Sequence, residues 1–480
     1  MLMRVTRLGI FLLRLIVKIP SQKQAVSTWP AAALVVSNMI GTGVFMSLGY
    51  QVAGFNRPDG ASLLTGSVFP IIMLWIVGGA LALCGALCYA ELATALPRSG
   101  GEYNFLSRIY HPMVGFCTGL CSATIGFAAP IAASALFFGK YLCRAFPGLA
   151  GMAPNHAEHA AAFILVALVT AAHLRSLRFT GLFQAASTVM TVGLILTFVI
   201  FGFSAAPAQP VTFVPRASDW SLLLSGAFFS SLIWVMYAYS GWNAAAYIVE
   251  EVRNPGKALP RALILGTAFV IVLYVAVNGV FLYTTPLALL SGEPEVAHVA
   301  GIQIFGQSGA RIGSALICVG LVANVSAMMW VGSRVSEAIG ATYPVLGFLG
   351  RTSKTRVPYV SLLYQFAIVL TLLFFDASNI INYIESVLLF WSLLAVLGVI
   401  VLRFREPDLP RPYRTWGYPA TPIIFAIITL FCLVQNSQNH FRETLIGAAT
   451  VLIGIPIYLW ASRNVPVEQL RGETLPESSM

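Results

Sequence analysis

The sequence predicts an all-α membrane protein with 12 transmembrane helices, and three observations support this fold class. Of the 480 residues, 58% are apolar and only 10% are charged, whereas typical soluble domains carry about 25% charged residues. The mean hydropathy is +0.81. Apolar stretches of about 20 residues, the length that crosses a bilayer, recur along the whole chain. Soluble enzymes, disulfide-rich secreted modules and disordered chains are therefore excluded.

Twelve apolar segments, separated mostly by short connections, account for most of the chain. They lie at 28–54, 62–95, 113–142, 158–174, 179–204, 221–249, 259–285, 310–338, 359–376, 380–402, 419–437 and 443–461. Residues 1–27 are expected to be a basic cytoplasmic or interfacial N-terminal region, of which 1–23 fit an amphipathic helix on the membrane surface. Residues 462–480 are expected to be a cytoplasmic tail.

The positions of Lys and Arg predict the orientation in the membrane. With a cytoplasmic N-terminus, 22 of the 28 cationic residues fall on the inner side, as the retention of positive loops requires. Both termini are therefore expected in the cytoplasm, and the chain in the cell (inner, cytoplasmic) membrane. The net charge is +10, but the Lys and Arg residues lie mostly between the apolar segments and do not gather on one face. No nucleic-acid partner is therefore expected.

Two segments carry polar residues and glycine at mid-membrane, where a continuous helix is otherwise expected. The first reads VVSNMIGTGVFMSLG and the sixth reads YAYSGWNAAAY. A matched pair of Gly-interrupted spans is typical of the binding site of an inverted-repeat transporter. A half-helix beginning after Gly41 would direct free amides at a carboxylate, and the carbonyls before it would suit an ammonium group or Na⁺. An α-amino acid carries both groups. The alternative is that the glycines only permit close helix crossing.

Three motifs resemble a known family. IGTGVF in the first segment, YSGWNAAAYIVEEVRNPGKALPRAL across the sixth and seventh, and RPYRTWGYPATP before the eleventh are similar to amino acid/polyamine/organocation (APC) superfamily permeases, closest to the L-type amino-acid transporter branch. The resemblance covers essentially residues 28–460. It implies a five-plus-five inverted-repeat (LeuT-like) core made of 28–204 and 221–402, helices 11 and 12 at 419–461, and alternating access.

The resemblance also implies which residues hold the substrate. By match to the glycine-rich motif of the family, four residues of the first segment would bind the substrate amine and carboxylate: Ile40, Gly41, Thr42 and Gly43. By match to its second motif, backbone carbonyls of the sixth segment would bind the amine: Tyr237, Ala238 and Ser240. Tyr237 stands where the branch commonly has a gating Phe. In the third segment, Thr124 and Ile125 are further candidates to line the pocket. The alternative is that the same sequence forms a proline kink packed against neighbouring helices.

The fifth segment departs from the family pattern. Many relatives carry a Lys that stands in for a sodium ion or a titrating group, and this chain has Thr191 at that position. The Thr191 hydroxyl could instead ligate Na⁺ or water, together with Asn324 or Ser326 of the eighth segment. Na⁺ coupling, H⁺ coupling and exchange therefore stay open. No cofactor and no metal site are expected, because the seven cysteines have no ligand partners in the sequence.

Few ionisable groups fall at membrane depth. None of the central segments offers a carboxylate near the pocket, which favours neutral L-amino acids over the alternative of cationic amino acids or polyamines. Glu385 lies about one turn inside the outer end of the tenth segment. It is a candidate for an outer gate or proton site, and the alternative is an interfacial side chain that reaches water.

Charges at the inner ends of the segments suggest a cytoplasmic gate. Glu250 and Glu251 could form salt bridges with Arg334, and Glu91 could join them; the alternative is ordinary topology charge. No catalytic set is evident, because the six histidines lie in loops or at span ends, so an enzyme is not expected. A channel would need polar pore-lining stripes instead of two broken helices. The amino acid and the bilayer are the expected partners, with no partner subunit evident.

Overall fold

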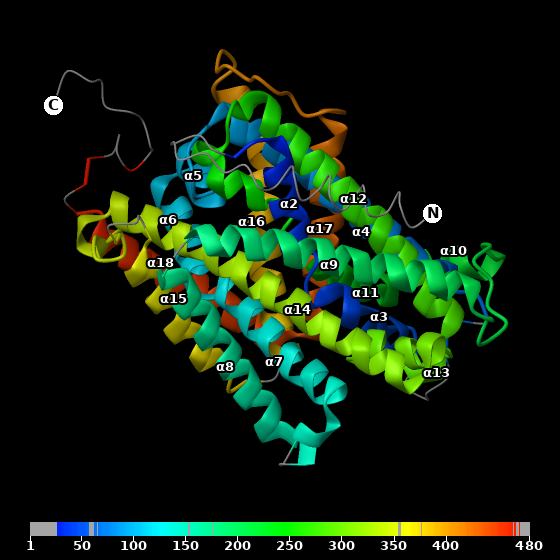
Figure 1. Cartoon of the computed structure of the whole chain (residues 1–480). Helices are drawn as coiled ribbons and strands as arrows, with labels where there is room; N and C mark the ends of the chain where they lie inside the picture. The colour runs from blue at the N-terminus through cyan, green and yellow to red at the C-terminus, as the bar shows by residue number, and fades with distance from the viewer. Residues whose placement is uncertain are drawn as a thin grey trace.

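The computed structural model describes residues 26–56, 62–64, 66–151, 154–175, 177–353, 357–375, 377–463, 465–466 and 470. Within this part of the chain the structure is helical, and only three isolated β-bridges are formed. The expected interfacial helix at 1–23 lies outside the described residues, as does most of the expected tail at 462–480. Figure 1 shows the helices gathered into one elongated bundle.

The first five predicted segments coincide with helices. The helical elements are α2 (Thr28–Met39), α3 (Gly43–Gly54), α4 (Phe69–Ala95), α5 (Glu102–Ile109), α6 (Pro112–Cys121), η1 (Ser122–Gly126), α7 (Ala128–Ala145), η2 (Pro147–Gly151), α8 (Pro154–Arg175) and α9 (Leu177–Ser204). The first predicted segment thus contains two helices, and the third contains two α-helices joined by a π-helical turn.

The remaining seven segments also coincide with helices. The elements are α10 (Ala217–Leu223), α11 (Gly226–Tyr239), η3 (Ala244–Glu251), α12 (Pro255–Thr284), α13 (Leu287–Leu290), α14 (Val296–Thr342), η4 (Pro344–Leu346), α15 (Tyr359–Leu372), α16 (Ala377–Arg405), α17 (Ala420–Asn439) and α18 (Phe441–Ala461). Helix α14 begins earlier than predicted because a first stretch precedes a bend at Gly306, whose φ of 71° is in the left-handed region that glycine tolerates.

Among the described residues, fewer helices than the twelve predicted segments are identified as membrane spans by length and composition. Within the described residues, nine helices are long and apolar enough to cross a membrane, and a tenth is obtained if Ala217–Leu223 and Gly226–Glu251, bent by 66°, form one span. Two shorter apolar helices, Thr188–Ser204 and Tyr359–Leu372, lie within the fifth and ninth predicted segments. An all-helical multi-span protein is confirmed, and the count of twelve and the repeat layout stay predictions.

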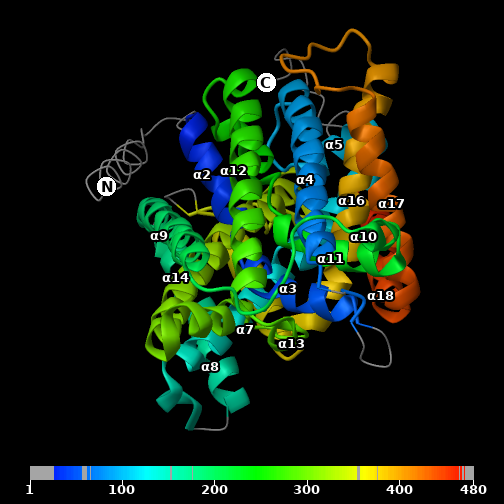
Figure 2. The same ribbon diagram turned by 90° about the vertical axis from the view of Figure 1, so that its right-hand side faces the viewer.

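The bundle has an apolar interior and an apolar exterior. Helix α12 packs against α2 and α4, and α14 packs against α7 and α9; Figure 2 shows α2, α12 and α4 beside one another. Large apolar side chains also point outward, among them Leu168, Ile200, Ile427 and Leu452. A soluble surface rarely exposes so much contiguous apolar area, so these side chains fit contact with lipid.

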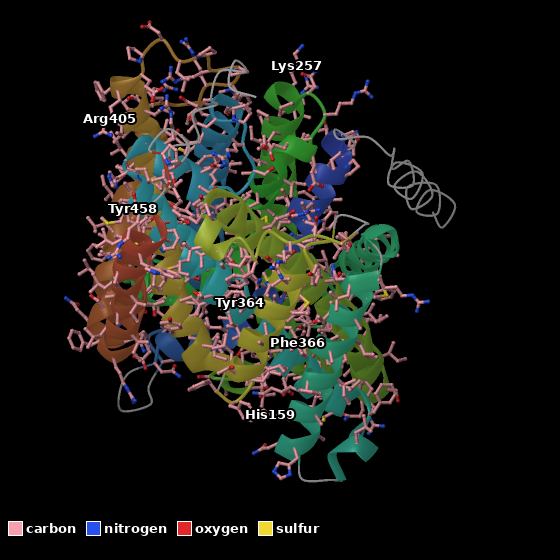
Figure 3. The ribbon with its side chains drawn as sticks, turned by 90° about the vertical axis from the view of Figure 1, so that its left-hand side faces the viewer. His159, Lys257, Tyr364, Phe366, Arg405 and Tyr458 are labelled. Atoms are coloured by element: carbon pink, nitrogen blue, oxygen red, sulfur yellow. The ribbon has the colours of Figure 1, made fainter. Side chains whose placement is uncertain are left out.

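Side chains labelled in Figure 3 mark the two ends of the bundle. Lys257 and Arg405, two of the 22 cations predicted on the cytoplasmic side, lie near one end, whereas His159 lies at the opposite end (Figure 3). At the Lys257 end, the chain entering α2 pairs with the chain leaving η3. The amide of Val26 donates to the carbonyl of Glu251 (3.0 Å), and the carbonyl of Val26 accepts from the amide of Arg253 (2.8 Å).

Candidate functional site

The first predicted span is broken in the middle. Helix α2 ends at Met39 and α3 begins at Gly43. Between them Ile40 leaves the helical region with φ −78° and ψ 87°. The predicted interruption at the Gly-x-Gly sequence is therefore present, and every residue from Met39 to Gly43 is buried. The first amides of a helix have no acceptor within that helix; in the first turn of α3, the Phe45 amide donates to the Thr42 carbonyl (3.0 Å).

The sixth span is broken at the matching position. Helix α11 ends at Tyr239, Ser240 is extended (φ −54°, ψ 151°), and Gly241 has φ 97°. Only glycine adopts that conformation without strain. The chain then continues as the 3₁₀-helix η3 instead of an α-helix, so the predicted interruption at YSGWN is also present.

The two breaks lie against each other. A side chain at Gly241 would meet the Asn38 carbonyl oxygen at 2.8 Å, and one at Gly43 would collide with the backbone of Ala238. The hydroxyls of Thr42 and Tyr237 are 3.1 Å apart. The glycines therefore permit close approach, as the alternative interpretation expected, and the same residues also interrupt the helices.

Side chains from two other helices occupy the carbonyls at the end of α2. Tyr274 of α12 donates to the Met39 carbonyl (2.6 Å), and the Asn324 amide of α14 donates to the Asn38 carbonyl at 3.3 Å. The Asn324 carbonyl oxygen accepts from Ser134 of α7 (2.9 Å). Asn324 thus reaches the first break, and it borders Gly41, where an added Cβ would lie 2.8 Å from its amide nitrogen.

A cavity of about 80 Å³ adjoins the second break. Its wall includes the turn 240–244, Asn38 of α2 and Met328 of α14. The volume holds several water molecules, each of which needs roughly 10–15 Å³. Of the predicted substrate residues only Ser240 borders this cavity, whereas Gly41 and Gly43 are covered by Asn324 and Ala238.

The two residues of the third span predicted to line the pocket do not border this cavity. The span is interrupted by the π-helical turn η1, and the cavity is bordered by Ser122, Gly126, Phe127 and Pro130. Thr124 and Ile125 do not border it: the Thr124 hydroxyl donates to the Leu120 carbonyl of its own helix (2.7 Å), and Ile125 is buried in packing. The wider π-helical turn shifts which side chains face inward, and a sequence pattern cannot show this shift.

Glu102, which no sequence motif singled out, lines the same cavity. It is 3% exposed, and its carboxylate accepts hydrogen bonds from the hydroxyls of Tyr89 and Tyr247 and from the amide of Asn243. Burial raises the pKa of Glu102, and these three donors act in the opposite direction. Gly101, directly before it, has φ 55°. The Gly-Gly-Glu sequence was therefore the available signal for a sharp turn before α5.

Glu385 is more buried within the protein than expected. It is 2% exposed and borders a second cavity of about 40 Å³, together with Ser240 and Trp242. The interpretation of Glu385 as an interfacial side chain reaching water is therefore wrong. The expectation that no central segment places a carboxylate near the pocket is wrong as well, because Glu385 of the tenth segment borders a cavity at the second break. Glu102, in α5 between the second and third predicted segments, borders the other cavity.

Two of the three other candidate coupling residues approach the first break. Thr191 packs against α14, where a side chain at Gly320 would meet its hydroxyl at 2.6 Å, and it shares a void of about 10 Å³ with Ile40. Asn324 contacts the same break. Ser326 does not join them, because it lies 3.0 Å from His173 of α8 and borders an apolar groove between α7 and α8.

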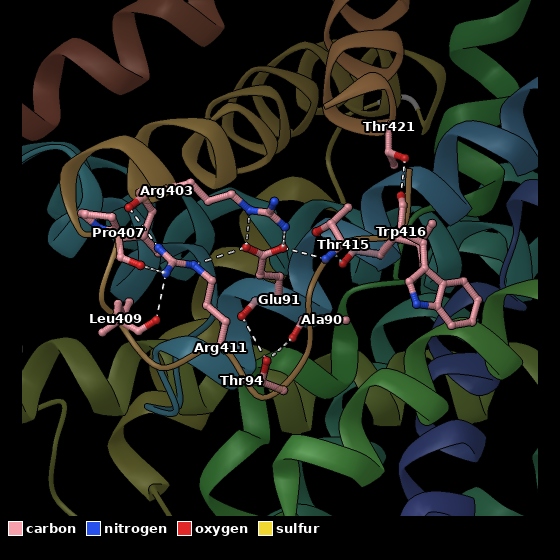
Figure 4. Close-up of polar contacts among 12 residues, drawn as sticks. Ala90, Glu91, Thr94, Arg403, Pro407, Leu409, Arg411, Thr415, Trp416 and Thr421 are labelled. Carbon is pink, nitrogen blue, oxygen red and sulfur yellow. Dashed lines mark hydrogen bonds and ion pairs between the residues drawn. The ribbon is translucent and has the colours of Figure 1, made fainter. Parts of the chain in front are cut away.

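The candidate gate residues separate into two groups. Arg334 lies 3.7 Å from the Glu251 carboxylate and 2.7 Å from that of Glu337, while the Glu250 side chain is exposed. Glu91 belongs elsewhere: it accepts two hydrogen bonds from Arg403 (2.8 and 2.7 Å) and one from the Thr415 amide (2.6 Å) (Figure 4). The proposed grouping of Glu91 with Arg334 is therefore wrong, because the loop before α17 folds back over α4.

Comparison with known proteins identifies the family. The family model described as amino acid permease matches residues 26–456. The chain belongs to this family. Relatives of the permease include Asc-type amino acid transporter 1 of Mus musculus, 26% identical over 92% of this chain and 82% of that protein. Large neutral amino acids transporter small subunit 2 of Homo sapiens is 27% identical over 91% and 80%, and the cystine/glutamate transporter of Pongo abelii is 27% identical over 91% and 85%.

The expected superfamily and the L-type branch are thereby confirmed. The permease is a multi-pass membrane protein of amino-acid transport, and the relatives named here are transporters, not enzymes. Their names cover different amino acids.

Proposed function

We propose that the permease moves neutral L-amino acids across the cell membrane by alternating access, as a secondary active transporter with both termini in the cytoplasm. The α-amino and α-carboxyl groups bind at the breaks between α2 and α3 and between α11 and η3. The observation that carries this proposal is that both breaks are buried, are in contact, and leave backbone groups at membrane depth, where only a cavity or protein can satisfy them. Ile40, Gly41, Thr42, Gly43, Tyr237, Ala238 and Ser240 are the proposed contacts.

A second candidate is transport of cationic amino acids or polyamines. The specific observation in its favour is the pair of buried carboxyl groups, Glu102 and Glu385, that border the two cavities. Glu102 already accepts three hydrogen bonds from neutral donors, which substitute for a cation. Neutral substrates therefore remain the first proposal.

The test is uptake of labelled amino acids into liposomes that contain the full chain. A panel of alanine, leucine, glutamate, cystine and arginine is offered while the Na⁺ gradient, the proton gradient and the internal amino acid are varied independently. Saturable uptake of alanine or leucine, with arginine excluded, supports the first proposal. Uptake of arginine alone supports the second, and no uptake of any amino acid contradicts both.

The name of one relative marks it as a small subunit, so the proposal includes a test for a partner chain. The mass of the permease purified in mild detergent from its native membrane distinguishes a single chain from a complex. Activity of the single purified chain in liposomes would show that no partner is needed for transport.

A further inference from the structure

The carboxyl group of Glu385 has no hydrogen-bond donor for one of its oxygens. Oε2 is buried and has no partner among the described residues. The cavity that it borders is walled mostly by apolar groups, including Gly78 and Ala82 of α4, Met236 of α11 and Phe425 of α17, and the hydroxyls that also border it make no hydrogen bond with Oε2. An ionised carboxylate without a donor or a cation at membrane depth is costly, so this environment favours the protonated acid.

No neighbouring titratable group changes that conclusion. The groups facing Glu385 are Tyr237 and Tyr239 of α11 and Cys432 of α17, and all three are neutral near pH 7 in their ordinary forms. The Tyr239 hydroxyl donates to the Trp75 carbonyl (3.0 Å), and the Tyr237 hydroxyl is hydrogen-bonded with Thr42. Helix α4 contributes only uncharged residues to this cavity, as does α16 apart from Glu385 itself.

The position of the cavity connects Glu385 to the proposed substrate site. Ser240, Trp242, Leu388 and Ser392 border both this cavity and the one beside the second break. The Trp242 ring packs against α4, where a side chain at Gly85 would meet it at 2.6 Å. A movement of the Ser240–Trp242 turn would therefore open the substrate cavity and admit water to Glu385 in the same step.

We infer that Glu385 is the proton-binding group that couples transport to a proton gradient. One proton binds to the carboxylate from the outer side, crosses with one amino acid, and leaves to the inner water when the turn opens to that side. No bond of the substrate is made or broken. This inference rests on the proposed function and assigns its coupling ion. We do not assign this role to Glu102, because three donors already occupy its carboxylate oxygens, whereas Oε2 of Glu385 has no partner among the described residues.

The experiment uses the full chain in liposomes at clamped voltage, with the internal pH one unit above the external pH. The probe is labelled leucine, or the amino acid of the panel that exchanges fastest. With one proton carried per substrate, the gradient drives accumulation to about tenfold, because one pH unit is a tenfold ratio of protons. Substrate addition also acidifies the lumen, which an internal pH dye reports. We expect Glu385→Gln to abolish both effects while exchange of internal for external amino acid continues.

Two further variants separate coupling from folding. Glu443→Gln, which removes a carboxyl at the start of α18 away from both cavities, is the matched control and should accumulate substrate as the wild type does. Glu385→Asp keeps a carboxyl group and should keep proton-driven accumulation with a shifted pH dependence, even if Glu385→Gln folds poorly.

Four results would overturn the inference. Exchange by the wild type without proton-driven accumulation contradicts the inference alone and leaves the proposed function intact. If Glu385→Gln accumulates substrate as the wild type does, Glu385 is not the proton-binding group. The same follows if Glu385→Gln keeps proton-driven accumulation and changes only how arginine competes for uptake. Absence of amino-acid flux in the wild type overturns the proposed function together with the inference.

Discussion

Replacing Glu91 with Gln tests how strongly the loop before α17 is held to α4. Glu91 is 1% exposed and accepts both bonds of a bidentate pair with Arg403, while the Arg411 guanidinium lies 3.5 Å away. Arg403 also stacks over the ring of Tyr418 at 3.8 Å. The variant leaves two guanidinium groups facing a neutral amide at a buried position. Breaking such a pair from one side costs about 3–5 kcal/mol, and the partial exposure of Arg403 places our expectation at about 3 kcal/mol.

The assay is the free energy of unfolding in mixed micelles, measured for wild type and variant under the same conditions. The matched control is Glu406→Gln, which removes the carboxylate 3.0 Å from Arg108 in a pair that is 27% and 29% exposed. A pair of this exposure is worth less than about 1 kcal/mol. A loss for Glu91→Gln no larger than that for Glu406→Gln would refute the reasoning that burial makes this cluster stabilising.

Three more outcomes are expected. Gly43→Leu should abolish uptake, because a side chain there collides with the backbone of α11, whereas Gly193→Leu, at a lipid-exposed site with nothing within 4 Å of an added Cβ, should preserve uptake; undiminished uptake by Gly43→Leu contradicts the assignment. Tyr237→Ala should change which amino acids compete for uptake, and an unchanged competition profile would remove Tyr237 from the site. Burial raises the pKa of Glu102, so the folded protein binds that proton more tightly than the unfolded chain, and wild-type stability should fall as pH rises from about 4.5 through the raised pKa. Glu102→Gln should remove that part of the pH dependence of the melting temperature, and identical profiles would contradict the argument.

The fold was largely predictable because membrane spans depend on local composition. Each predicted segment coincides with a helix, and both interruptions could be placed because glycine beside polar residues is unusual at membrane depth. The bend at Gly306 was not foreseen, because Gly306 lies in the connection before the eighth predicted segment at 310–338, where no helix was predicted. The span count stays a prediction, since Thr188–Ser204 and Tyr359–Leu372 are shorter than the spans that length alone identifies.

The contacts of the site were less predictable, because they join residues far apart in the chain. Glu91 and Arg403 are 312 positions apart, and no spacing rule connects them. The depth of Glu385 depends on how α4, α11 and α17 cover α16, and the burial of Glu102 depends on a turn at two glycines. Motifs located the breaks correctly, but only tertiary packing shows which carboxyl groups lie beside them.

The paired backbones of Val26 and residues 251–253 have a mechanical consequence. Two hydrogen bonds fasten the start of the first interrupted span to the end of the sixth, so tilting one of these spans pulls the other along. Under the proposed alternating access, the two spans would therefore move as one rigid pair. Their two breaks would then change the side of the membrane that they face while staying in contact with each other and with the proposed zwitterion.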